Sequence, residues 1–116
     1  MVVRAGGEAV CERVSLADTP LTRLKGLLGR AGLGSDEGLL IRPTSAIHTW
    51  FMRFPIDAVF LDGQLVVVGV KSDLRPWRFA GRRGAKAVLE LAAGESRRRG
   101  IQTGERLELV SPASEG

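Results

Sequence analysis

Hydrophobic and polar residues alternate with a period of two along much of this chain, and that period is typical of β-strands. Near the start, for example, Val10, Val14 and Leu16 fall on one side of an extended segment. Alternation of this kind, together with a few short apolar runs, predicts strands in about seven segments: 9–17, 38–42, 47–52, 56–61, 64–70, 87–94 and 100–110.

The spacing changes to that of a helix between Asp18 and Arg30. Leucines at positions 21, 24, 27 and 28 share one face, Asp18 or Thr19 can cap the first turn, and Pro20 suits that turn. A glycine at 29 or 32 ends this segment. Residues 95–100 leave room for one or two further helical turns.

Two details of the strand pattern lead to specific expectations. Asp62-Gly63 separates two β-rich runs, so it predicts a hairpin with a type I′ turn. Strict alternation in 47–52 places its residues on two faces: Ile47, Thr49 and Phe51 on one, His48, Trp50 and Met52 on the other. Arg53-Phe54-Pro55 then interrupts the strand.

The whole pattern predicts a mainly β protein, a compact and largely antiparallel barrel or sandwich of about seven short strands with one or two short helices. A chain of 116 residues without linker or repeat is expected to form a single domain over 1–116. Residues 111–116 read as a flexible tail.

Composition indicates whether the chain is folded and in which compartment it is expected. Hydrophobic residues make up 44% and charged residues 26%, which argues against disorder outside the chain ends. No secretory signal and no apolar run long enough to span a bilayer is present, and the single cysteine, Cys11, cannot form an internal disulfide. We expect a cytoplasmic protein in which Cys11 is a small hydrophobic residue of a strand.

Positive charge is concentrated between Lys71 and Gly100, a range that contains nine basic residues and three acidic ones. Within this region a long basic loop, residues 71–86, combines cations with the aromatic residues Trp77 and Phe79. Its candidate binding residues are Arg75, Trp77, Arg78, Arg82 and Arg83. Such a composition occurs where single-stranded nucleic acid binds. It fits equally a solvated loop whose aromatic side chains pack into the core, and we favour that interpretation because no nucleic-acid motif is present.

Five segments in order resemble one protein family: ADTPLTRLKGLLGR, EGLLI, HTWFMRFPIDAVFLD, AVLELAAG and GIQTGERLELV. Together they are similar to the prokaryotic family called domain of unknown function 192, over about residues 10–110. The resemblance implies a single-domain β-sandwich or barrel with short helical insertions and no established activity. This chain departs from many members in the short connection between Met52 and Pro55, which shortens a loop beside the site considered next.

His48 is the only histidine of the chain, and imidazole is the side chain most often used for proton transfer in enzymes. Asp57 or Asp62 can orient its ring, and Thr49 or Ser45 can supply a hydroxyl, which gives a nominal hydrolase set. No nucleophile motif accompanies it. We therefore interpret His48 as structural first, as part of a ligand site second and as catalytic last.

Asp57 stands at the start of an apolar strand, where an aspartate needs a partner. Arg53, four residues earlier, can supply that partner in an internal brace around Pro55. Alternatively, Arg53 and His48 form a polar rim that faces an anionic or hydroxylated ligand. The candidate ligand-binding residues are His48, Thr49, Trp50, Met52, Arg53 and Asp57.

One histidine and one distant cysteine do not make a zinc site, and no stretch has the ligand spacing of a calcium loop, so we predict neither metal nor cofactor. The first functional hypothesis is a small non-enzymatic binding or accessory module for a ligand or a partner protein. The alternatives are a hydrolase-type acid–base enzyme that uses His48 with Asp57, and weak nucleic-acid binding through residues 75–99.

Overall fold

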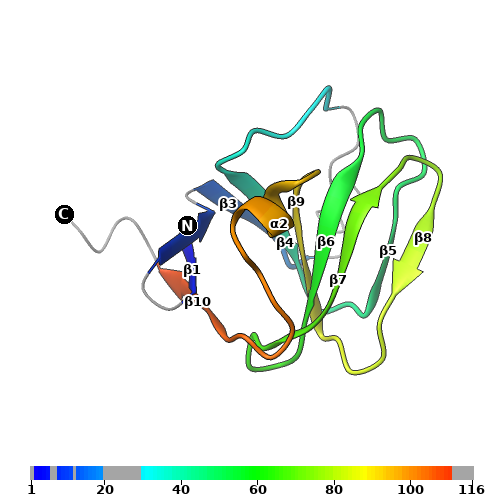
Figure 1. Ribbon diagram of the computed structural model, residues 1–116. Coiled ribbons are helices and arrows are strands. Elements are labelled where there is room, and N and C mark those ends of the chain that lie inside the picture. The colour runs from blue at the N-terminus through cyan, green and yellow to red at the C-terminus, as the bar shows by residue number, and fades with distance from the viewer. Residues whose placement is uncertain (1, 6–7, 12, 20–29, 111–116) are drawn as a thin grey trace.

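The computed structural model of the chain describes residues 2–5, 8–11, 13–19 and 30–110. This part of the chain is mainly β, as predicted, and contains ten short strands and one short helix (Figure 1). The strands are β1 (Val2–Ala5), β2 (Glu8–Cys11), β3 (Arg13–Ala17), β4 (Glu37–Ile41), β5 (Ala46–His48), β6 (Ile56–Leu61), β7 (Val67–Leu74), β8 (Phe79–Gly81), β9 (Ala87–Ala92) and β10 (Leu107–Val110). The helix, α2 (Glu95–Arg98), lies between β9 and β10.

A five-stranded sheet in the order β3-β4-β9-β6-β7 forms the centre of the molecule. Its strands are antiparallel neighbours except for the parallel pair of β3 and β4. All six residues of β6 are buried, because this strand has a neighbour on each side and packed side chains on both faces. Such burial explains why β6 reads as an almost continuous apolar run.

Each face of the central sheet carries its own layer of packed side chains. On one face, Val59 and Leu89 pack with Leu107 of β10. On the other face, Phe60 and Val88 pack with Ile47 of β5. The sheets β10-β1-β2 and β5-β8 do not join the central sheet, so the described strands form no closed barrel.

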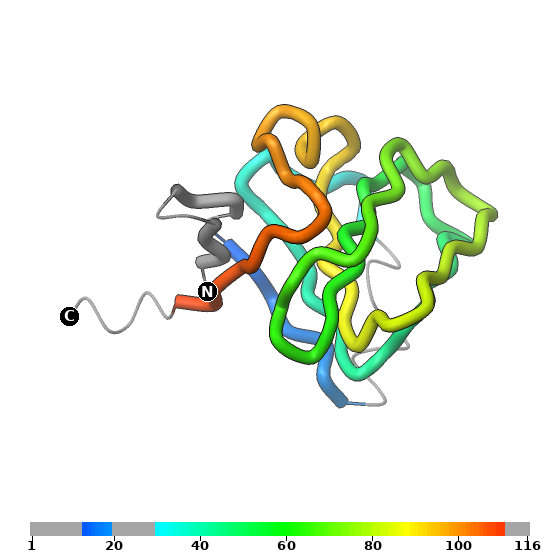
Figure 2. Tube along the Cα trace, turned by 60° about the horizontal axis from the view of Figure 1, so that its bottom comes forward, coloured from blue at the N-terminus to red at the C-terminus, as the bar shows by residue number. Residues whose placement is uncertain are grey.

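The two-stranded sheet of β5 and β8 forms an arm on the side of the molecule opposite β1 and β10 (Figure 1). Figure 2 shows the same two chain segments running side by side from another direction. Ile47 and Ala80 are partners on the inner side of this arm and contact the central sheet, whereas His48 and Phe79 are partners on its outer side. The arm therefore presents its second side to solvent.

Several sequence predictions are confirmed. Strands occur in the predicted segments around residues 39, 89 and 109, and a single helical turn begins at Glu95. The hairpin of β6 and β7 is also confirmed. The predicted strand 9–17 is divided between β2 and β3, which belong to different sheets. The loop expected after Lys71 contains the end of β7 and the whole of β8.

The type I′ turn predicted at Asp62-Gly63 is wrong. Gly63 does not have positive φ, and the positive φ in this connection, 65°, occurs at Leu65. The reason is the Asp62 carboxylate, whose Oδ1 accepts hydrogen bonds from the backbone N–H groups of Gln64 at 2.8 Å and Val66 at 3.0 Å. These bonds hold a wider loop in place of a two-residue turn.

Strict alternation over 47–52 is also wrong. Strand β5 ends at His48, and Phe51 has a φ of 67°, which breaks the extended conformation. As a result Met52 is buried and Phe51 is exposed. The predicted alternation instead placed Met52 on the same face as Trp50, which is exposed.

Some predictions fall outside the described residues. Most of the predicted helix after Asp18, the side chain of Cys11 and the tail 111–116 are among them. Within the part that the structure does describe, no helix has the length and apolar character needed to cross a membrane.

Candidate functional site

Asp57 lies in the interior and makes four hydrogen bonds there. Its side chain is 0% exposed. Oδ1 accepts from the backbone N–H of Asp73 at 2.9 Å, and Oδ2 accepts from the N–H groups of Gly94 at 3.1 Å and Ser96 at 2.9 Å. The Ser96 hydroxyl also donates to Oδ2, at 2.5 Å. Asp57 therefore ties β6 to the end of β7 and to the first turn of α2.

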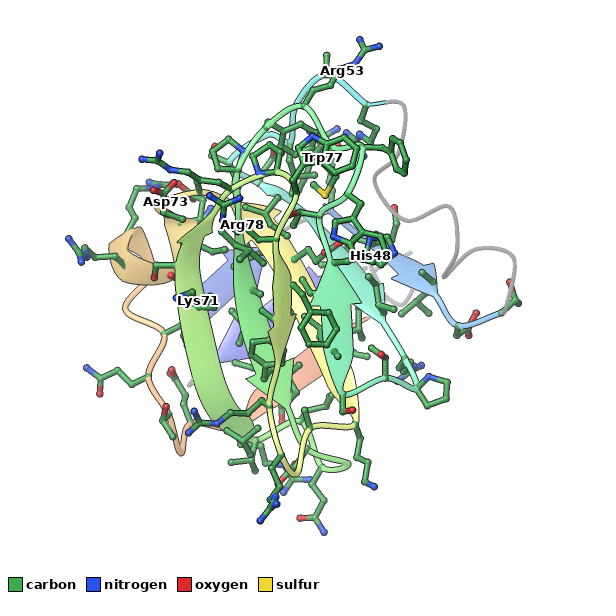
Figure 3. The ribbon with its side chains drawn as sticks, turned by 90° about the vertical axis from the view of Figure 1, so that its right-hand side faces the viewer. His48, Arg53, Lys71, Asp73, Trp77 and Arg78 are labelled. Carbon is green, nitrogen blue, oxygen red and sulfur yellow. The ribbon has the colours of Figure 1, made fainter. Side chains whose placement is uncertain are left out.

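The predicted brace between Arg53 and Asp57 is therefore wrong, although Asp57 does have internal partners. The N-cap residue of helix α2 is Gly94, which has no side chain to cap the free N–H groups, and the Asp57 carboxylate takes that role from the neighbouring strand. Arg53 is exposed and points away from the body of the molecule at the tip of its loop (Figure 3). Asp57 is therefore not part of the polar rim that the sequence suggested beside His48 and Arg53.

Five aromatic rings gather on the outer side of the β5–β8 arm. We call this surface the aromatic face, and its residues are His48, Trp50, Phe51, Trp77 and Phe79. The four larger rings are 47–69% exposed, although residues of this kind are ordinarily buried. His48 stacks on Trp50 with ring centroids 4.7 Å apart at 27°, and Phe51 meets Trp77 at 4.7 Å and 59°.

Four cations border the aromatic face, and we call them the basic rim: Arg53, Lys71, Arg75 and Arg78. Figure 3 shows Lys71 and Arg78 on the same side of the molecule as His48 and Trp77. Lys71 and Phe79 line one shallow groove of about 330 Å³ between β7 and β8. Among the described residues, only Arg75 of this rim has an acidic partner, Asp73 at 3.9 Å.

Backbone geometry keeps two of the rings exposed. Phe51 has φ 67° and Trp77 has φ 65°, a conformation that glycine or asparagine ordinarily supplies. A non-glycine residue there costs about 1 kcal/mol or more, and such strain gathers at functional positions. Both residues lie in tight turns, so their side chains project outward instead of packing on the sheet.

Thr49 connects the two turns. Its buried hydroxyl accepts a hydrogen bond from the backbone N–H of Arg78 at 2.9 Å and donates to the carbonyl of Arg75 at 2.5 Å. A turn over residues 75–78 is ordinarily closed by a hydrogen bond from the N–H of Arg78 to the carbonyl of Arg75. Here the Thr49 hydroxyl lies between these two groups and bonds to both. The Thr49 carbonyl also accepts from the N–H groups of Met52 at 3.2 Å and Trp77 at 3.0 Å. One residue therefore fixes the position of both turns of the aromatic face.

The structure thus brings together residues that the sequence placed in two separate candidate sites. Thr49, between His48 and Trp50 of the first group, is hydrogen-bonded to the backbone of Trp77 and Arg78 of the second. The aromatic side chains of the basic loop do not pack into the core, so the interpretation we favoured from sequence is wrong on that point: Trp77 is 58% and Phe79 69% exposed.

The remaining candidates lie elsewhere. Met52 is buried in the layer beneath the arm, and Asp57 faces α2. Arg82 and Arg83 follow the far end of β8, where Arg82 lies against Gly69 of β7.

The nominal hydrolase set is not assembled by these contacts. His48 stacks on Trp50, the Asp57 carboxylate is bonded to α2 and the β7 end, and the Thr49 hydroxyl is bonded within the 75–78 turn. No group of three or more potential metal ligands occurs among the described residues.

Sequence reasoning missed three notable residues. Alternation placed Phe51 on the same face as Ile47 and Thr49, and Phe79 was recognised as an aromatic residue of the basic loop but not named as a candidate binding residue. Glu90 was overlooked altogether, although a glutamate in the middle of the apolar strand β9 is a detectable signal. Its side chain is 3% exposed between the register partners Leu39 and Ala58, and burial raises the pKa of Glu90 to about 8.

Comparisons with known proteins extend the resemblance seen in the motifs. The family model of domain of unknown function 192, described as an uncharacterised ACR, matches residues 1–109. A UPF0127 protein of Pyrococcus furiosus is 33% identical over 106 residues, which cover 88% of this chain and 90% of that protein. A UPF0127 protein of Thermococcus sibiricus is 32% identical over 99 residues, 81% of this chain but only 64% of that protein.

The fold is shared with a crystal structure of a protein of unknown function from Novosphingobium aromaticivorans. The TM-score is 0.82 at 26% sequence identity, and the match covers 93% of this chain and 82% of that chain. With a family match over nearly its full length, this chain belongs to the family of domain of unknown function 192.

Proposed function

We propose that this protein is a non-enzymatic binding module that holds an anionic partner on its aromatic face and basic rim. The observation that carries this proposal is the exposure of four large aromatic side chains on one small arm. Contiguous exposed apolar surface of this kind marks interaction sites in folded proteins. Tryptophan in particular is enriched where binding energy is concentrated.

The charge of the surrounding residues supports an anionic partner. Neither residues 38–56 nor residues 75–89, which build the arm and its turns, contain an aspartate or a glutamate. Arg53, Lys71 and Arg78 make no ion pair within the described part of the chain. Three cations without an acidic partner among the described residues attract an anion, and the attraction weakens as salt is added.

A non-enzymatic role agrees with the way the polar side chains are used. The hydroxyl of Thr49 and the carboxylate of Asp57 are both hydrogen-bonded within the fold, and His48 stacks on Trp50 instead of contacting either group. A cytoplasmic location belongs to the same proposal, since a single cysteine suits a reducing compartment.

A polyanion without aromatic rings tests this function. We expect a size-defined heparin oligosaccharide to bind at about 50 mM salt and to change the tryptophan fluorescence, because Trp50 and Trp77 lie beside the cations. The double variant Arg53→Ala/Arg78→Ala should bind about tenfold more weakly, since two ionic contacts are lost.

The matched control removes the same charge elsewhere. Arg97→Ala/Arg106→Ala changes two exposed arginines outside the arm. This control should bind the oligosaccharide as the wild type does. Equal weakening by both double variants would mean that only net charge matters, and the proposed site would be wrong.

A further inference from the structure

The aromatic face has the properties of a stacking platform. Each of its four larger rings has a substantial exposed surface. His48 and Trp50 form one close pair of rings, Phe51 and Trp77 form another, and Phe79 is 69% exposed. A flat ring that stays open to solvent can stack on another flat ring, and every nucleobase has such a π-face.

Cations alternate with the rings along both turns. Arg75, Trp77, Arg78 and Phe79 follow one another within five positions, and Trp50 and Phe51 are followed by Arg53. A single-stranded nucleic acid offers the same alternation, because each base is joined to a phosphate. Arginine suits both contacts, since its guanidinium pairs with phosphate and stacks on bases.

From these observations we infer that the anionic partner is a single-stranded nucleic acid. Its bases stack on Trp50, Trp77 and Phe79, and its phosphates contact the basic rim. The inference rests on the proposed function and adds the chemical class of the partner to it. A duplex does not fit, because its bases are already stacked and paired.

An acidic protein segment is the competing class of partner. Peptide recognition usually relies on side-chain pockets or on a groove that buries an anchor. The groove beside Phe79 is shallow, and Phe51 and Trp77 project from the turns instead of lining a cavity. The arrangement therefore favours stacked nucleobases over an anchored peptide side chain. Binding of an acidic peptide is one of the results that the test can give.

The test compares four probes with the full chain at about 50 mM salt: an oligothymidylate of about 12 nucleotides, an abasic oligomer of equal length, its duplex with oligoadenylate, and oligoglutamate of equal charge. We expect the oligothymidylate to bind at least about tenfold more tightly than the abasic oligomer, because stacking contributes a substantial share of affinity. The duplex and oligoglutamate should bind more weakly than the oligothymidylate.

A double variant locates the stacking. Trp50→Ala/Phe79→Ala changes two exposed side chains, so it should fold normally. It should lose the advantage of oligothymidylate over the abasic oligomer and keep the wild-type affinity for the abasic one. A variant that retains the full advantage would overturn the assignment of these two rings.

Failure of the inference and failure of the proposed function give different results. Equal binding of the oligothymidylate and the abasic oligomer, or of the duplex, would overturn stacking and leave an anion-binding surface. Tighter binding of oligoglutamate would identify an acidic protein segment instead. If none of the four probes binds and the heparin oligosaccharide also fails, both the inference and the proposed function are wrong.

Discussion

Asp57→Asn is expected to lower the free energy of unfolding by about 3 kcal/mol or more, as measured by urea denaturation followed by circular dichroism. An asparagine of the same size offers only one oxygen. Its amide nitrogen would face either the N–H of Asp73 or the three donors from Gly94 and Ser96, and two donors cannot bond to each other. At least one buried backbone N–H is then left without an acceptor.

The control is the same exchange at Asp62. The same oxygen of Asp62, Oδ1, accepts the hydrogen bonds from Gln64 and Val66, so Asp62→Asn keeps an acceptor in place and should stay within about 0.5 kcal/mol of the wild type. If Asp57→Asn is as stable as Asp62→Asn, the Asp57 carboxylate does not hold β6, β7 and α2 together.

Glu90 is expected to make the protein less stable as the pH rises. Burial raises its pKa from the usual 4.5 to about 8, so the folded protein holds a proton that the unfolded chain releases. The stabilisation is complete below pH 4.5 and is lost as the pH approaches 8. Over this window the free energy of unfolding should fall by up to about 1.4 kcal/mol per pH unit from this group.

Glu90→Gln removes the titrating group and keeps its size. Its free energy of unfolding should exceed that of the wild type by a few kcal/mol near pH 8, by an order-of-magnitude reckoning, and the two should converge near pH 4.5. Glu108→Gln, on an exposed residue of β10, should retain the wild-type profile. Parallel profiles for the wild type and Glu90→Gln would show that Glu90 is charged in the folded state.

The sequence predicted those parts of the fold that depend on local pattern. The hairpin of β6 and β7, the strand β9 and the mainly β class all follow from alternation and turn residues. The form of the hairpin loop did not, because the Asp62 carboxylate competes with the backbone for the N–H groups that a tight turn would use.

The site was less predictable, because its geometry depends on contacts distant in sequence. An aspartate in an apolar strand indicated that Asp57 needs an internal partner, but the predicted partner Arg53 was wrong, because Ser96, 39 residues away, takes that place. Positive φ at Phe51 and Trp77 has no sequence signal, since neither residue type favours it. Thr49 joins two turns about 26–29 residues apart, and alternation alone does not reveal such a connection.

The proposed function places the partner of this protein on the aromatic face. Amide chemical-shift mapping of the ¹⁵N-labelled full chain with the heparin oligosaccharide tests it without altering the protein. We predict that the largest shifts occur in residues 48–53 and 75–79, together with the indole N–H signals of Trp50 and Trp77. Largest shifts around α2 or along β10, with residues 48–53 unchanged, would contradict the account.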